Sequence, residues 1–134
     1  MNTFPLRIGT PDGLLFEGNV VQVSCRTITG DLAILAGHIN YVAPLGMGEA
    51  MVLVDGEKRR AACIGGMVSV VDGKVTLLPT TFEWSQDIDL DRAKASEQRA
   101  KSVLENKGAS ETEIILAKAR LKRALVRKGV ASRK

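Results

Sequence analysis

The sequence predicts a small β-sandwich or barrel followed by a pair of helices, and two observations support this. As far as about residue 85, short β-branched runs alternate with turn residues every roughly eight to twelve positions, which is typical of all-β domains. From residue 88 onward, alanine, lysine, arginine and glutamate recur at helical spacing. We therefore expect an α+β chain in which residues 1–86 form the β-domain and residues 87–134 form a helical hairpin.

Turn residues divide the β-rich part into its strands. Asp55-Gly56 and Asp72-Gly73 each separate two apolar runs, and Asp-Gly supplies the positive φ angles that a tight hairpin needs. Residues 10–13, with the sequence Thr-Pro-Asp-Gly, predict a further turn. The expected strands are 6–8, 14–17, 20–25, 32–35, 51–54, 60–64, 68–71 and 75–78.

The helical part divides into helices at about 89–106 and 111–128. Residues 106–108, Asn-Lys-Gly, are typical of a helix end, and Ser110 with Glu113 forms a capping-box pattern at the next helix start. Alanine-rich faces allow close approach but bury little area, so the hairpin is marginal and can open. Its ~40 residues would reach about 60 Å end to end. The apolar stripe of the second helix is Ile114, Ala117, Leu121, Ala124 and Leu125.

Charge is distributed unevenly along the chain. Residues 1–87 have a net charge of −3 and residues 88–134 a net charge of +7. A basic helical arm on a mildly acidic body predicts an acidic partner: nucleic acid, a membrane surface, an acidic protein segment or a phosphate ligand. Nucleic acid is disfavoured, because residues 88–134 contain no aromatic side chain on which bases could stack.

The two cysteines and the hydropathy indicate where the protein works. Cys25 and Cys63 are far apart and lack metal-ligand spacing, and Cys25 alternates with Val21 and Val23 as a core residue would. We find no leader pattern, and no apolar run approaches the ~20 residues that cross a bilayer. We expect a soluble protein of a reducing compartment, linked to a membrane only through a partner.

Catalytic motifs are missing from the sequence. It contains no phosphate-binding loop, dinucleotide-binding motif, zinc-protease motif or nucleophile elbow. His38 is the single histidine, so a histidine-based metal cluster is excluded. We expect no catalysis by this chain alone. His38 itself, in a turn region, is either a hydrogen-bonding surface residue or a partner contact.

Asp89 and Arg92 stand where the sandwich gives way to the first helix. In one interpretation Asp89 is an N-cap and Arg92 is solvated. In the other, Arg92 opposes the positive end of the helix dipole, and a nearby carboxylate or a bound phosphate compensates it. The residues alone leave both interpretations open.

Taken in order, these features resemble the epsilon-subunit family of bacterial F-type ATP synthases over almost the whole chain. Residues 10–13, 16–18, 30–38 and 65–66 are similar to the sandwich signatures of that family, and residues 119–124 are similar to its second helix. The ATP-binding motif of the family resembles residues 88–93, in which the matching positions are Ile88, Asp89, Arg92 and Ala93.

The resemblance implies a ten-stranded β-sandwich with a two-helix hairpin, placed in the central rotor stalk. The sandwich would dock on the gamma subunit and on the ring of c subunits, with Asp31 and His38 as candidate c-ring contacts. The subunit would couple proton-driven rotation to ATP synthesis. It would inhibit ATP hydrolysis when its extended helices reach acidic carboxyl-terminal segments of the beta subunits. It would lie at the cytoplasmic face of the bacterial cell membrane as a peripheral part of the complex.

The resemblance also implies a regulatory ligand. No cofactor or metal site is required, but ATP, with Mg²⁺ as an optional companion, would bind the folded hairpin. Further ligand contacts would come from Glu83, from Arg99 and from Arg123 or Arg127. The chain departs from the family at residues 82–86, where charged and alanine-rich residues are usual, and at Lys122 and Val126 in the second helix.

Two readings outside the rotor family remain. The basic arm is also compatible with a stand-alone nucleotide-sensing module or a basic nucleic-acid-binding module. An enzyme in its own right would have to turn over ATP without a phosphate-binding loop. Co-purification with a gamma subunit, as against salt-dependent binding of nucleic acid, separates these alternatives.

Overall fold

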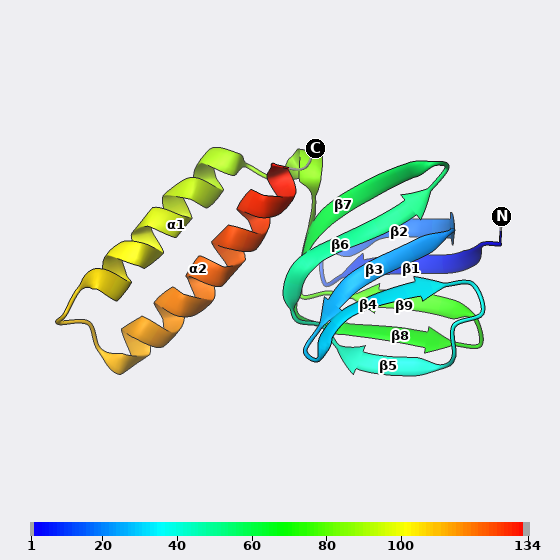
Figure 1. Cartoon of the computed structure of the whole chain (residues 1–134), viewed down its shortest axis with the longest axis horizontal. Helices are drawn as coiled ribbons and strands as arrows, with labels where there is room; N and C mark the ends of the chain where they lie inside the picture. Colours follow the sequence, from blue (N-terminus) through cyan, green and yellow to red (C-terminus); the bar gives the residue numbers. More distant parts are fainter. Residues whose placement is uncertain (1, 133–134) are drawn as a thin grey trace. The chain divides into compact units, whose positions relative to one another are not determined.

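The computed structural model describes residues 2–132, which form two compact units that meet between Trp84 and Ser85. The first unit has ten strands in two five-stranded sheets, and the second has two α-helices (Figure 1). The predicted fold class is therefore confirmed. The strands are β1 (Phe4–Thr10), β2 (Gly13–Val20), β3 (Gln22–Thr27), β4 (Gly30–Leu35), β5 (Tyr41–Pro44), β6 (Met47–Val54), β7 (Glu57–Ile64), β8 (Met67–Val71), β9 (Lys74–Leu78) and β10 (Thr81–Trp84).

The two sheets enclose one aliphatic core. One sheet has the order β2-β1-β9-β8-β5 and the other the order β10-β7-β6-β3-β4. Neighbouring strands are antiparallel except β1 and β9, which pair in parallel. Alternate side chains of each strand point inward, as the period of two requires. The inward side chains that are fully buried include Leu6, Ile8, Val20, Val23, Ile34, Val52, Val68, Val70 and Leu77.

The Asp-Gly turns form as the sequence predicts. Asp55 and Gly56 have φ angles of 52° and 76°, and Asp72 and Gly73 have φ angles of 50° and 80°. Two successive positive φ angles define the type I′ turn, whose twist matches that of the flanking strands. The turns join β6 to β7 and β8 to β9 in an uninterrupted register.

Several strand limits differ from the prediction. The run 20–25 is not one strand, because β2 ends at Val20 and β3 begins at Gln22. Strand β6 starts at Met47, four residues before the predicted start, because glycine at position 48 leaves room for the Arg26 side chain that lies against it. Strands β5 and β10 were not predicted. Each has four residues, and their proline, charged and aromatic content hides the alternation.

Both cysteines are buried in the core and free. Burial, with a smaller contribution from the Asp31 carboxylate, raises the pKa of the Cys25 thiol to about 11. Burial also raises the pKa of the Cys63 thiol to about 12, with Cys25 as the second cause. Both thiols therefore stay protonated near neutral pH and react poorly. The prediction that Cys25 is a small core residue is confirmed.

The second unit consists of a 3₁₀ turn, η1 (Ser85–Asp87), and two antiparallel helices, α1 (Leu90–Glu105) and α2 (Glu111–Ala131). The predicted capping box opens α2. The hydroxyl of Ser110 accepts the backbone N–H of Glu113 at 3.1 Å, and the Glu113 carboxylate accepts the backbone N–H of Ser110 at 3.2 Å. Two of the orphan donors at this helix end are thereby satisfied.

Helix α2 extends past the end expected near Lys128 and Gly129 and reaches Ala131. A glycine inside a helix costs about 1 kcal/mol relative to alanine. Val130 and Ala131 are buried, and their burial offsets that cost. Ser132 then closes the helix, since its backbone N–H and its hydroxyl both donate to the carbonyl of Lys128, at 3.2 and 2.8 Å.

An aromatic cluster anchors the last strand of the sandwich. The Trp84 ring meets those of Phe82 and Phe16 edge to face, with ring centroids 4.9 and 6.4 Å apart. The guanidinium of Arg59 lies 4.0 Å from the centroid of the Trp84 ring, within range of a cation–π interaction. Phe16 belongs to an edge strand of one sheet and Trp84 to an edge strand of the other. The chain therefore leaves the sandwich from a fixed point.

Gly66 is predicted to be indispensable to the sandwich. Its φ is +93°, and a Cβ at this position would overlap the carbonyl oxygen of Leu78. We expect Gly66→Ala to lower the free energy of unfolding by more than about 3 kcal/mol. Gly73→Ala, at a φ of +80° with no atom near the added Cβ, should cost only about 1–2 kcal/mol of backbone strain. Denaturant unfolding of both variants measures the difference, and equal losses would contradict the steric argument.

Candidate functional site

Asp89 is the N-cap of helix α1. The Asp89 carboxylate accepts the backbone N–H of Arg92 at 3.0 Å, and the backbone adopts the extended conformation of an N-cap. The capping interpretation of Asp89 is therefore confirmed. The Arg92 side chain is exposed in the first turn, where the helix dipole is positive. The geometry leaves the guanidinium and the exposed carboxylate of Asp89 within the same turn.

The two apolar positions of the 88–93 motif are structural. Ile88 and Ala93 are both buried, and the backbone N–H of Ala93 closes the first helical hydrogen bond onto Asp89 at 3.0 Å. Of the four matching positions of the motif, Asp89 and Arg92 are thus the ones with exposed side chains. The buried side chains of Ile88 and Ala93 fix the turn from which Asp89 and Arg92 project.

The two helices meet along a seam with a spacing of four, three and four residues. Alternate positions of the seam are alanines, and small side chains allow close approach of the two helices over a narrow strip. We call the following residues the seam: Ala93, Glu97, Ala100 and Leu104 of α1 and Ala117, Leu121, Ala124 and Lys128 of α2.

Arginines and lysines are sorted to opposite sides of this seam. Each arginine from 88 to 132 directly precedes a seam residue, whereas Lys94, Lys101, Lys118 and Lys122 directly follow one. One residue is a rotation of about 100°, so the two kinds of cation project from opposite flanks of each helix. The arginines are Arg92, Arg99, Arg120, Arg123 and Arg127.

The antiparallel arrangement brings the arginines of both helices to one side of the hairpin. Two antiparallel helices are exchanged by a two-fold rotation about an axis perpendicular to the plane that contains both helices. Residues that directly precede a seam residue therefore lie on the same flank of the hairpin in both helices. We call this side the arginine flank. It holds the predicted ligand residues Arg99, Arg123 and Arg127 together with Arg92. Arg123 and Arg127 thus lie on the same flank as the arginines of α1, although the second helix departs from the family pattern at Lys122 and Val126. Arg120 also belongs to it, although the sequence did not single it out.

Glu83 lies apart from that set in the chain. It is a residue of β10, opposite Ala62 of β7, and is partly buried. It belongs to the sandwich unit, while the arginine flank belongs to the helical unit. The family resemblance made Glu83 a candidate, and its part in a ligand site stays a prediction.

A buried carboxylate, Glu97, interrupts the alanine seam. The Glu97 side chain is 5% exposed and lies 3.0 Å from the ammonium of Lys128 on α2 and 2.8 Å from that of Lys101 on α1. Hydrogen bonds from Lys101 and from Lys128 lower its pKa. The burial of Glu97 was not predicted, because a glutamate four residues before a lysine usually forms an exposed pair on one helix. Its seam spacing from Ala93 was the available signal.

Asp31, a candidate partner contact, is already engaged with a neighbouring strand. It sits opposite Arg26 in the pairing of β4 with β3, and the guanidinium donates to both carboxylate oxygens at 3.1 and 3.3 Å. The pair is exposed, so its net contribution to stability is small. The Arg26 side chain in turn lies against Gly48.

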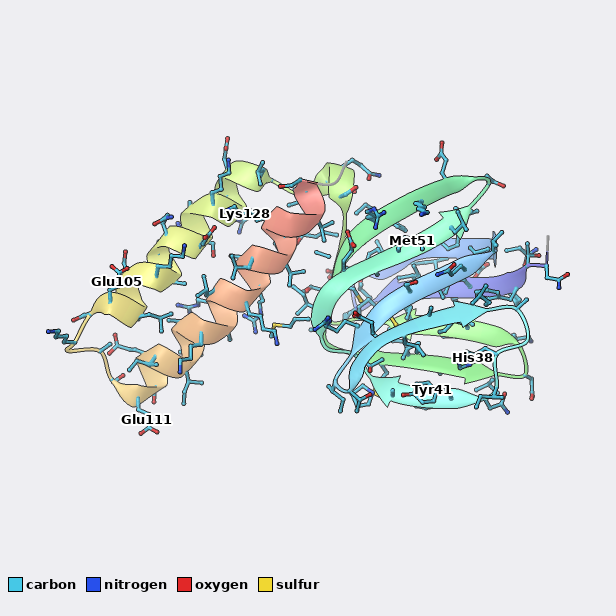
Figure 2. The ribbon with its side chains drawn as sticks, in the orientation of Figure 1. His38, Tyr41, Met51, Glu105, Glu111 and Lys128 are labelled. Atoms are coloured by element: carbon cyan, nitrogen blue, oxygen red, sulfur yellow. The ribbon has the colours of Figure 1, made fainter. Side chains whose placement is uncertain are left out.

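His38 lies in the loop after β4, at the end opposite to Asp31. Its Nδ1 is 2.7 Å from the carbonyl oxygen of Ile39, and its ring meets that of Tyr41 edge to face (Figure 2). Asn40 ties the same loop to the β8–β9 turn by accepting the backbone N–H of Asp72 at 2.8 Å. Because strand β4 separates them, Asp31 and His38 are not brought together into one loop cluster.

The edge of the sandwich along β4 and β5 is rich in exposed apolar side chains. Ile39 is 76% exposed, and the others are also well exposed to solvent. Both strands are edge strands of their sheets. This apolar edge consists of Ile28, Leu35, Ile39 and Val42, with Asp31 and His38 at its two ends.

The outward face of the β2-β1-β9-β8-β5 sheet is a second candidate contact surface. Met67 and Leu78 are neighbours in the pairing of β8 with β9, and both are exposed. Beside them, an open depression of about 590 Å³ is lined by Arg7, Thr10, Pro11, Leu14, Leu78 and Pro79. Its breadth suits a protein surface better than an enclosed small ligand.

Among residues 2–132, no group of three or more His, Cys, Asp or Glu side chains could hold a metal ion. No helix in that range combines the length and apolar character that a membrane span needs.

Comparison with known proteins gives full-length matches. Residues 3–85 match the β-sandwich domain of the ATP synthase delta/epsilon chain family, and residues 86–131 match its long α-helix domain. The chain is 42% identical over 135 residues to the ATP synthase epsilon chain of Ruminococcus albus, covering 100% of both chains. It is 40% identical over 133 residues to that of Bacillus pumilus, covering 99% of this chain and 100% of the relative.

Solved structures share the fold. A chain of the Euglena gracilis mitochondrial ATP synthase aligns with a TM-score of 0.85 at 22% identity, covering 95% of this chain and 80% of that chain. A chain from the central stalk and c-ring of the Tetrahymena thermophila mitochondrial ATP synthase aligns with a TM-score of 0.64 at 14% identity, covering 95% of each. At these identities the likeness establishes the fold alone.

Acidification is predicted to weaken the helical hairpin through Glu97. Because the folded state lowers the pKa of Glu97, its contribution to stability is complete above the unfolded pKa of about 4.3 and is lost as pH falls through the folded value. We expect the helical signal in circular dichroism to decline with pH in this range, and Glu97→Gln to remove part of that decline. Trp84 fluorescence reports the sandwich separately. An identical acid profile in the variant would contradict the assignment.

Proposed function

This chain belongs to the delta/epsilon chain family of ATP synthases, and we propose that it is the rotor subunit that couples rotation to ATP synthesis and restrains ATP hydrolysis. Within such a complex the epsilon chain is a non-catalytic subunit. The observation that carries the proposal is the joint match of both domains, sandwich and helices, over residues 3–131. A stand-alone binding module would not require this pairing.

The sandwich would dock the subunit in the central stalk. Epsilon chains of this kind would contact a gamma subunit and a ring of c subunits, and the names of the structural relatives mention the c-ring and the central stalk. If Asp31 and His38 both touch the ring, the contact has to run along the apolar edge, because they lie at opposite ends of β4. The outward face with Met67 and Leu78 then remains for gamma.

The helical hairpin would be the inhibitory arm. Half of its seam positions are alanines, which bury little area at ~25 cal/mol per Å². Opened into one continuous rod, its ~40 residues would span about 60 Å. The net charge of +7 over residues 88–134 suits acidic carboxyl-terminal segments of beta subunits as the surface engaged by the open arm. Docking of the sandwich on the central stalk would place the chain peripherally at the cytoplasmic face of the bacterial membrane.

ATP would act on this arm as a signal. The arginine flank draws guanidinium groups from both helices, and guanidinium binds phosphate oxygens in a bidentate manner. Such a ligand would bind the closed hairpin alone, with Mg²⁺ as an optional companion and no cofactor required. A ligand at a hundredfold excess over its Kd stabilises the form that it binds by about 2.7 kcal/mol. A shift of that size can outweigh a narrow alanine seam.

Removing the arm is predicted to release hydrolysis. In the assembled complex, a chain lacking residues 88–134 should leave rotor assembly intact, because the sandwich is a compact unit of its own. ATP hydrolysis should rise in proportion to the fraction of arms that are extended in the complete complex. Steady-state hydrolysis of the two complexes, matched for gamma content, measures the effect. Equal rates at low ATP would contradict the inhibitory role.

Two substitutions in the capping turn are predicted to abolish ATP binding. Asp89→Ala and Arg92→Ala should each remove the heat of ATP binding in calorimetry of the full chain. Asp89→Ser retains a side-chain cap, so it should keep the helix but still lose ATP. Lys94→Ala, on the opposite flank, is the matched control and should bind normally. Absence of heat from the unmodified protein at millimolar ATP would refute the site.

A further inference from the structure

Glu97 is the one charged side chain of α1 that the helical hairpin buries. Its neighbours in the seam of α1, Ala93 and Ala100, carry no functional group. The carboxylate uses one oxygen for Lys128 at 3.0 Å and the other for Lys101 at 2.8 Å. The side chains of Lys101 and Lys128 are 45% and 41% exposed, so water reaches both ammonium groups while the carboxylate stays covered.

We propose that Glu97 is the latch of the helical arm, and that its bond to Lys128 sets both the closed state and the helix register. The inference rests on the proposed function in assuming that the arm opens. It adds the residues that decide how readily opening occurs.

The two lysines have different parts in this arrangement. Lys101 is four residues after Glu97 on the same helix, so this pair survives when the helices separate. Lys128 is 31 residues away and reaches Glu97 only in the closed hairpin. Lys101 therefore orients the carboxylate, while Lys128 closes the arm. Loss of Lys128 leaves the covered carboxylate with one partner. Leaving a buried charge partly uncompensated is the main free-energy cost of breaking a buried ion pair.

An alanine seam needs such a register device. The seam alanines recur every seven residues, so sliding one helix past the other by about two turns would place alanine against alanine again, at little cost in packing. A single buried polar contact is the best-attested means of fixing helix register. The register in turn aligns Arg92 and Arg99 with the arginines of α2. The latch is therefore a positioning element for the arginine flank.

A carboxylate also makes the closure reversible. When the arm opens, Glu97 and Lys128 both regain water, so the open form exposes no large apolar side chain at this position. Apolar residues in place of a buried ion pair are often neutral or stabilising. Replacing both partners by methionine should thus hold the arm closed and remove the switch.

Hydrogen exchange of α2 amides in the full-length protein tests the latch. Isolated helices of this length are marginal, so opening of the hairpin exposes these amides. Glu97→Gln and Lys128→Met should each accelerate exchange along α2 by roughly tenfold, the effect of losing one charge-assisted hydrogen bond. Lys101→Met should have a smaller effect. Lys122→Met, an exposed lysine on the same helix, is the matched control and should have none.

Double variants complete the test. Glu97→Gln combined with Lys128→Met should exchange no faster than Lys128→Met alone, because both remove the same bond. Glu97→Met with Lys128→Met should exchange as slowly as the unmodified protein or more slowly. Unchanged exchange in both Glu97→Gln and Lys128→Met, or additive acceleration in the first double variant, would overturn the latch.

Hydrolysis by the assembled complex separates the latch from the function it serves. With the latch and the inhibitory role both correct, the faster-exchanging variants inhibit hydrolysis more strongly and the double methionine variant less. Altered exchange with unaltered hydrolysis would sustain the latch and refute the inhibitory arm. Unaltered exchange refutes the latch whatever the hydrolysis rate.

Discussion

The narrow seam between α1 and α2 is the constraint on which the behaviour of this chain depends. Small side chains at Ala93, Ala100, Ala117 and Ala124 let the helices approach closely, but each buries little apolar area. Leucine at these four positions would bury far more area and would hold the hairpin closed whether or not a ligand is bound. In the proposed function, alanine keeps the free-energy difference between closed and open forms within the range that one bound nucleotide or one ion pair can reverse.

The sandwich has the opposite physical character, and the contrast separates the tasks of the two units. Its core is filled by branched aliphatic side chains such as Ile8, Ile34 and Leu77, each fully buried between two sheets. Trp84, held by Phe16 and Arg59, ends this rigid region one residue before η1. A rigid body suits permanent docking. A marginal arm that starts at a fixed point suits movement, because its opening need not disturb the docked surface.

Local chemistry decided which features could be predicted from the sequence. The Asp55-Gly56 turn and the capping box of Ser110 and Glu113 need only their own residues, and both formed as predicted. Features that depend on tertiary neighbours were missed. Strand β10 is defined by its pairing with β7, which the sequence of its four residues does not indicate. Glu97 looked like an exposed glutamate until the facing helix covered it. The residues proposed to contact ATP also depend on tertiary neighbours, so their roles stay predictions.

The sorting of cations on the two sides of the seam supports the proposal that a ligand acts on closure. Glu97 neutralises lysines at and beside the seam, whereas the arginines lie together on the other flank. Arginines from α1 and α2 share that flank only while the helices are paired. An anion that needs guanidinium groups from both helices therefore binds the closed form and has no equivalent site in the open one. Linkage then requires the anion to favour closure by its binding free energy, without any further moving part.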